Sequence, residues 1–145
     1  MRLVVDMNIL FSFFKKDSTT RELITSFDMF ELYSPLFGFK ELLKNRDKIC
    51  GYSRISIPEF KEVVEDLNLF VDFIPDEKFK DFGVKASKIL SSHIKDAPYA
   101  ALVFWFKSKG YETGLWSNEK RLGILERYGV KVHTTNELLK LFGFI

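Results

Sequence analysis

The chain has 145 residues, of which 46% are hydrophobic and 29% are charged, so it can bury a core and fits one domain of ordinary size. Its net charge of +2 neither requires nor excludes a nucleic-acid partner, because a local basic patch can bind phosphate. The single cysteine, Cys50, excludes an intrachain disulfide and a zinc site built from thiolates. The sequence contains no apolar run near the ~18 residues of a membrane-spanning helix, so we expect a cytoplasmic protein with no membrane partner.

The first half of the chain is predicted to combine two short strands with several helices. Leu3-Val4-Val5 is a short apolar run with β-branched residues, which is typical of a buried strand, and this strand should end at Asp6. The capping-box spacing of Ser56 and Glu59, with Pro58 in the first turn, predicts a helix over 57–68. The other expected elements are helices over 7–14 and 20–28, a strand over 31–33 that Ser34-Pro35 stops, and a helix over 36–45.

The second half alternates helices and strands more regularly. Asp96-Ala97-Pro98 opens a helix that runs to about Lys109 and is apolar almost all round, which indicates a buried helix. The other expected elements are a small strand over 71–75, helices over 76–91 and 119–127, strands over 113–116 and 129–133, and a last helix from 134. We therefore predict one α/β domain over 1–145, a three-layer α/β/α sandwich with a central, mainly parallel sheet.

Acidic side chains stand where the predicted sheet would bind a ligand. Asp6 ends the first strand, Glu119 follows the strand over 113–116, and Asp96 opens the buried helix. Open parallel sheets bind ligands beyond the carboxyl ends of their strands, so we expect these acids to converge there, joined by Glu41. Crowded carboxylates raise one another's pKa, and a hard divalent cation, Mg²⁺ or Mn²⁺, would relieve that repulsion.

Each acid also has an ordinary structural explanation. Asp6 would suit a solvated turn, and Asp96 would suit a helix N-cap. Glu41 would suit a solvated helix face, and Glu119 would suit the first turn of a helix. Spacing alone therefore predicts an acidic pocket and no more.

The ordered set of these motifs resembles the PIN domain family, which is the fold of the VapC-type toxin ribonucleases. The matching segments are Leu3–Leu10 with its Asp-x-Asn, Tyr33–Pro35 followed by Glu41-Leu42, Asp96–Leu102, Leu115–Leu122 and Tyr128–Leu139. The resemblance implies that Asp6, Glu41, Asp96 and Glu119 are catalytic carboxylates that bind Mg²⁺ or Mn²⁺, with Asn8 and Ser117 as supporting polar groups. Glu119 departs from the family, where the fourth acid is more often Asp.

By this resemblance the activity would be metal-dependent hydrolysis of single-stranded or structured RNA. The protein would be a toxin of a toxin–antitoxin pair, with an antitoxin as partner, or an RNA-processing enzyme. A basic cluster near Glu41 would hold the RNA backbone, or would be only a solvated helix face: Lys40, Lys44, Arg46 and Lys48. Phe11, Phe13 and Phe14 are either core residues or a platform for stacked bases.

Three alternatives and one assembly state remain open at this point. The alternatives are a non-catalytic RNA-binding PIN domain, a DNA flap-type nuclease, and a small nucleotide-binding or phosphoacceptor domain, although no Gly-rich fingerprint follows the first strand. We also expect a two-fold homodimer, partly from the family and partly from the many aromatic and apolar residues in 57–68 and 76–91.

Overall fold

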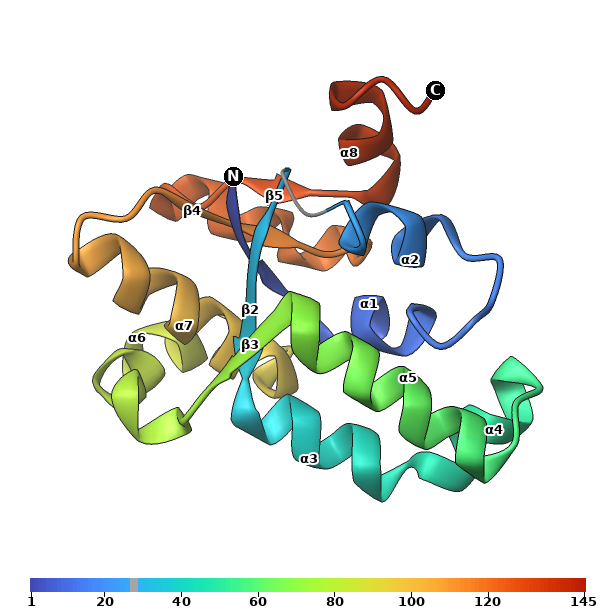
Figure 1. The fold of residues 1–145 in the computed structure, drawn as a ribbon. Helices are drawn as coiled ribbons and strands as arrows, with labels where there is room; N and C mark the ends of the chain where they lie inside the picture. Colours follow the sequence, from blue (N-terminus) through green and yellow to red (C-terminus); the bar gives the residue numbers. More distant parts are fainter. Residues whose placement is uncertain (27–28) are drawn as a thin grey trace.

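A parallel five-stranded sheet lies at the centre of the computed structural model, which describes residues 1–26 and 29–145 (Figure 1). The strands are β1 (Arg2–Val5), β2 (Glu31–Pro35), β3 (Val71–Ile74), β4 (Thr113–Trp116) and β5 (Val132–His133). They pair in the order β3-β2-β1-β4-β5, and every described pair is parallel. The chain moves outward from β1 through β2 and β3, then returns to place β4 on the other side of β1. The carboxyl ends of β1 and β4 therefore flank the point where an open α/β sheet binds its ligand.

Helices cover both faces of the sheet. Alternate residues of β1 point to opposite faces, and both sets are apolar and need to be buried. Leu3 and Val5 enter one core cluster, and Val4 enters the other. The first cluster is covered by α1 (Met7–Ser12), α2 (Thr19–Ile24), α3 (Leu36–Lys44), α4 (Arg46–Ser53), α5 (Ile57–Phe70) and α8 (Thr135–Leu141). The second is covered by α6 (Gly83–Ile89), α7 (Ala97–Ser108) and the 3₁₀ helix η4 (Lys120–Tyr128). This is the predicted three-layer sandwich.

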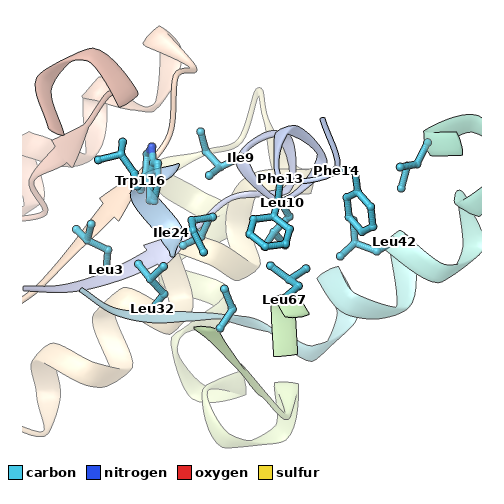
Figure 2. Packing of buried hydrophobic residues seen from close by; sticks show 14 of the residues in the cluster. Leu3, Ile9, Leu10, Phe13, Phe14, Ile24, Leu32, Leu42, Leu67 and Trp116 are labelled. Atoms are coloured by element: carbon cyan, nitrogen blue, oxygen red, sulfur yellow. The ribbon is translucent and has the colours of Figure 1, made fainter. Parts of the chain in front are cut away.

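Aromatic side chains, among them Phe13, Phe14 and Trp116, pack between the aliphatic residues of the first cluster (Figure 2). The rings of Phe14 and Phe60 stack with centroids 5.0 Å apart, and Phe13 meets Phe14 edge-on. Trp116 is fully buried, and its Nε1 donates to Thr135 Oγ1 at 3.1 Å. Phe13 and Phe14 are therefore core residues, which makes the idea that they form a base-stacking platform wrong.

Local signals in the sequence explain several element boundaries. Ser56 N donates to Glu59 Oε1 and Glu59 N donates to Ser56 Oγ, so the predicted capping box is present at the start of α5. At the start of α8, Glu137 N donates to Thr134 Oγ1 at 3.1 Å. β2 continues through Ser34-Pro35, beyond its predicted end, and β5 is shorter than predicted. Residues 27 and 28 of the predicted helix over 20–28 lie outside the described residues.

Two segments predicted as α-helices contain 3₁₀ structure instead. Residues 120–128 form η4, and the segment over 76–91 begins with 3₁₀ turns η1 (Asp76–Lys78) and η2 (Lys80–Phe82) before α6. The spacing of the core contacts is compatible with 3₁₀ structure. Leu122 and Leu125 are buried three residues apart, as are Phe79 and the partly buried Phe82, and a 3₁₀ helix places every third residue on one side.

The apolar residues that suggested a dimer mostly face inward. Phe60, Leu67 and Phe79 are buried, and the partly buried residues pack against the same two clusters: Val63, Val64, Phe82 and Ile89. These residues therefore give little exposed surface for a two-fold dimer, and the dimer stays a prediction. None of the described helices is long and apolar enough to cross a membrane.

Candidate active site

Three of the four predicted acids line one cavity of about 460 Å³. Asp6 comes from the end of β1, Glu41 from α3 and Asp96 from the start of α7, and the supporting residue Asn8 lines the same space. The remaining described lining residues are Met7, Phe37, Ile94, Lys95, Pro98 and Tyr99. Three segments that are distant in the sequence thus bring carboxylates to the carboxyl edge of the sheet.

Asp6 is held firmly at the end of β1. Its backbone N donates to Trp116 O at 3.2 Å, and its Oδ1 accepts from Ile9 N at 3.0 Å, which caps α1. The residue is only 4% exposed, so it is not the solvated turn residue that the sequence allowed. Burial raises the pKa of Asp6 to about 6, hydrogen bonds from the Ser117 hydroxyl and Ile9 N oppose this rise, and the charge of Asp96 adds to it. The predicted crowding is therefore a smaller cause than burial.

Asp96 stands at the N-cap position of α7 but, within the described part of the chain, its side chain makes no capping hydrogen bond. A role as N-cap therefore agrees with the position of Asp96 in the chain, but its carboxylate is not used for capping. Partial burial and then the charge of Glu119 raise the pKa of Asp96, while His93 and Arg121 lower it. Its carboxylate is left facing the cavity that it shares with Asp6.

Glu119 differs from the other three acids. It is absent from the cavity's described lining, and Arg121 Nε donates to its Oε1 at 2.9 Å. The hydrogen bonds from Arg121 lower the pKa of Glu119. Its backbone N donates to Ser117 Oγ at 3.0 Å, so the buried Ser117 connects the Glu119 backbone with the Asp6 carboxylate. Glu119 is near enough to Asp96 to influence its pKa, but it is already paired with a cation.

Tyr99 is a cavity residue to which the sequence analysis gave no role. It is 2% exposed, and its hydroxyl has no hydrogen-bond partner among the described residues. Burial and the charges of the surrounding acids, Asp6 foremost among them, raise its pKa. A Cβ on Gly38 would lie 3.0 Å from this hydroxyl, so glycine leaves the room that it occupies. The available signal was helical spacing, since Tyr99 follows Asp96 by three residues.

The predicted RNA-binding cations do not gather in the acidic cavity. Lys40, Lys44, Arg46 and Lys48 are all exposed and all absent from its described lining, where Lys95 is found instead. Arg46 pairs with Asp47 at 3.2 Å. Lys48 lines an adjoining cavity. A solvated helix face describes Lys40 and Lys44 adequately, and RNA contact by the four residues stays a prediction.

The donor chemistry of the cavity suits a hard divalent cation. Asp6, Glu41 and Asp96 offer carboxylate oxygens, which Mg²⁺ and Mn²⁺ prefer to nitrogen or sulfur. Burial is the main cause of the raised pKa values of Asp6 and Asp96, so the ionised carboxylates are disfavoured there and a bound cation would stabilise them. Among residues 1–26 and 29–145, no three His, Cys, Asp or Glu side chains form a group that could hold a metal ion in the present arrangement. The oxygen donors of this cavity therefore fit a hard divalent ion.

The fold and the cavity define an α/β/α protein with an acidic site at the carboxyl edge of a parallel sheet. A family model for the PIN domain matches residues 4–142, and the chain belongs to this family. No curated protein matches the chain. Membership implies nuclease-type function, and PIN domain nucleases generally depend on divalent metal ions. The predicted family is confirmed, and the VapC-type subtype stays a prediction.

Proposed function

We propose that the protein is an endoribonuclease that uses Mg²⁺ or Mn²⁺ to hydrolyse single-stranded RNA. The observation that carries the proposal is the shared cavity of Asp6, Glu41 and Asp96, which is lined by residues that follow the carboxyl ends of β1 and β2. Uncompensated carboxylates in a partly enclosed site are costly, and function is the usual reason for keeping them. Family membership supports nuclease chemistry, and the all-oxygen donor set supports the choice of ion.

In this proposal each described residue has a distinct task. Asp6, Glu41 and Asp96 would hold the ion, which would supply an activated water and neutralise charge on the phosphate. Ser117 and the Ile9 N–H orient the Asp6 carboxylate by hydrogen bonding, as outer-shell partners of metal ligands do. The Tyr99 hydroxyl is free to donate to a phosphate oxygen or to a carboxylate in the cavity.

A cleavage assay tests the proposal. Wild-type protein should cut a 5′-labelled single-stranded RNA in Mn²⁺ and should not cut it in EDTA. Asp96→Asn should slow cleavage on the order of 1,000-fold, since metal catalysis contributes several kcal/mol and each 1.36 kcal/mol is tenfold. Glu112→Gln is the matched control, because Glu112 is an acid with 83% of its side chain exposed that precedes β4, at the opposite edge of the sheet.

The result that would contradict the proposal is an Asp96→Asn variant that cuts as fast as wild type. Two further substrates separate the alternatives. Preferential cutting of a DNA flap would replace RNA by DNA as the substrate, and tight RNA binding without any cutting would favour a non-catalytic RNA-binding domain.

A further inference from the structure

A second cavity, of about 490 Å³, adjoins the acidic one. Its described lining residues are Asn8, Phe11, Ser12, Lys15, Lys48, Ile49 and Tyr52. Asn8 lines both cavities, so the two spaces meet at the first turn of α1. The charge of the second cavity is opposite to that of the first, because it contains two lysines and, among its described lining residues, no acid.

Tyr52 differs from most of the aromatic residues because its side chain is exposed to solvent and does not pack in the core. It is 73% exposed and belongs to neither described core cluster. Lys15 Nζ donates to the Tyr52 hydroxyl at 3.1 Å and lies 4.4 Å from the ring centroid. Lys15, in the bend after α1, thus contacts the exposed ring of Tyr52 in α4, 37 positions away, at the edge of the second cavity.

The negative charge of the acidic cavity indicates why a positively charged cavity beside it would help to bind RNA. The carboxylates of the acidic cavity repel the phosphates of an RNA strand, so binding free energy has to come from cations and apolar surface nearby. Lys15 and Lys48 supply the positive charge, and Tyr52 and Phe11 supply aromatic surface. Aromatic side chains beside cations are the usual means of binding single-stranded nucleic acid, and the cavity volume lies in the ordinary range for ligand pockets.

We propose that the second cavity is a nucleotide subsite for the same RNA strand whose scissile phosphate enters the acidic cavity. Tyr52 stacks on the base, Phe11 contacts it from the cavity wall, and Lys15 and Lys48 neutralise flanking phosphates. The proposal rests on the proposed function for the nature of the strand. It adds where the strand is held and which side chains hold it.

The test measures binding separately from cleavage, by fluorescence anisotropy of a labelled single-stranded RNA in EDTA. Tyr52→Ala should weaken binding by about 5- to 150-fold, the factor for one lost base stack, while Tyr52→Phe keeps the ring and stays within about threefold of wild type. Lys48→Gln should weaken binding and reduce the slope of log affinity against log salt by about 0.7, the value for one phosphate contact in single strands.

Tyr128→Ala is the matched control. Tyr128 is 48% exposed beside Lys85 and Lys88 in another cavity, but that cavity shares no described lining residue with the acidic one. RNA binding should be unchanged in this variant. As a direct readout, RNA that contains 5-iodouridine should photo-cross-link to Tyr52, which mass spectrometry of the digested adduct would locate.

The outcomes separate the two proposals. Wild-type binding by Tyr52→Ala, equal losses in Tyr52→Ala and Tyr128→Ala, or no RNA binding by the wild type would each overturn the subsite. RNA that is bound through Tyr52 but never cut in Mn²⁺ would overturn the ribonuclease activity and leave the subsite standing.

Discussion

Asp6 and Glu119 follow neighbouring parallel strands, β1 and β4, yet their carboxylates are in opposite electrostatic states. Asp6 is buried, has no ion-pair partner among the described residues, and has its pKa raised to about 6. Glu119 is partly exposed, is paired with Arg121 at 2.9 Å, and has its pKa lowered. An unpaired buried carboxylate is stabilised when a cation binds. Glu119 would first have to break its ion pair with Arg121. Position at the sheet edge therefore does not by itself decide which of these acids would bind a metal ion.

The largest effect that follows from this difference concerns cleavage. Asp6→Asn should slow RNA hydrolysis on the order of 1,000-fold, as a lost metal ligand would. Glu119→Gln should cost at most about 10- to 100-fold, the range for a residue that acts beyond the metal ligands, and should leave measurable activity. Rates in Mn²⁺ under single-turnover conditions measure both. Complete loss with Glu119→Gln beside a mild loss with Asp6→Asn would reverse the ranking.

The second prediction concerns stability without metal. The folded pKa of Asp6 lies above its ordinary 3.8, so folding favours the protonated carboxyl. The contribution of Asp6 to the free energy of unfolding should be greatest below pH 3.8, should fall as pH rises toward about 6, and should level off above it. The rise from 3.8 to about 6 corresponds to ~3 kcal/mol at pH 7. Asp6→Asn removes this cost and keeps a capping oxygen, so urea unfolding in EDTA should show a gain approaching ~3 kcal/mol at pH 7 and little gain at pH 4.

Glu59 supplies a control of opposite sign. Hydrogen bonds in the capping box lower the pKa of Glu59 to about 2, so its contribution is present above its ordinary 4.5 and lost as pH falls through 2. Glu59→Gln should destabilise the protein at pH 7. A gain at pH 7 with both substitutions would mean that the two carboxylates do not differ as described.

The third prediction is that Mg²⁺ or Mn²⁺ stabilises the fold. A ligand that binds only the native state adds about 1.4 kcal/mol at ten times its dissociation constant. Thermal melts of the wild type should therefore shift upward with the ion, and those of Asp96→Asn should not. Glu119→Gln should keep most of the shift, because Glu119 is held by Arg121. Equal shifts in all three proteins would point to an ion bound elsewhere.

The smallest expected effect belongs to Tyr99. Its buried hydroxyl has no partner in the described residues, and a buried polar group without a partner costs ~1–3 kcal/mol. Tyr99→Phe should then raise the free energy of unfolding in EDTA by about 1 kcal/mol. The same change should lower the rate of cleavage in Mn²⁺. A destabilised Tyr99→Phe variant would show that the hydroxyl is already satisfied in the folded protein.

Much of the fold could be predicted because its signals are local. The β-branched run before Asp6 indicates β1, and the spacing of Ser56 and Glu59 indicates the start of α5. The α4 helix was missed, because its opening residues are charged and only Ile49 of it is buried. The 3₁₀ segments were missed because apolar residues three apart, such as Leu122 and Leu125, share one face of an α-helix as well as of a 3₁₀ helix.

The positions of the candidate site residues could be predicted from the sequence, but the burial and the ion pairing of each residue could not. The strand ends placed Asp6, and helix spacing placed Asp96 and Glu41. Burial of Asp6 and the pairing of Glu119 with Arg121 depend on how several elements pack around them. The contact between Lys15 and Tyr52 joins residues 37 apart, and no periodicity in the sequence records it.

The most direct test of the acidic site is the anomalous diffraction of manganese in a crystal of the wild type grown with MnCl₂. We expect a peak in the cavity, with carboxylate oxygens of Asp6, Glu41 and Asp96 around it. The metal–oxygen distances should be ~2.0–2.3 Å, from the value for Mg²⁺ up to the shortest value for Ca²⁺. Glu119 should still be paired with Arg121 in that crystal. A cavity without manganese at saturating concentration, or an ion bound at Glu119 and not at Asp6, would contradict the account.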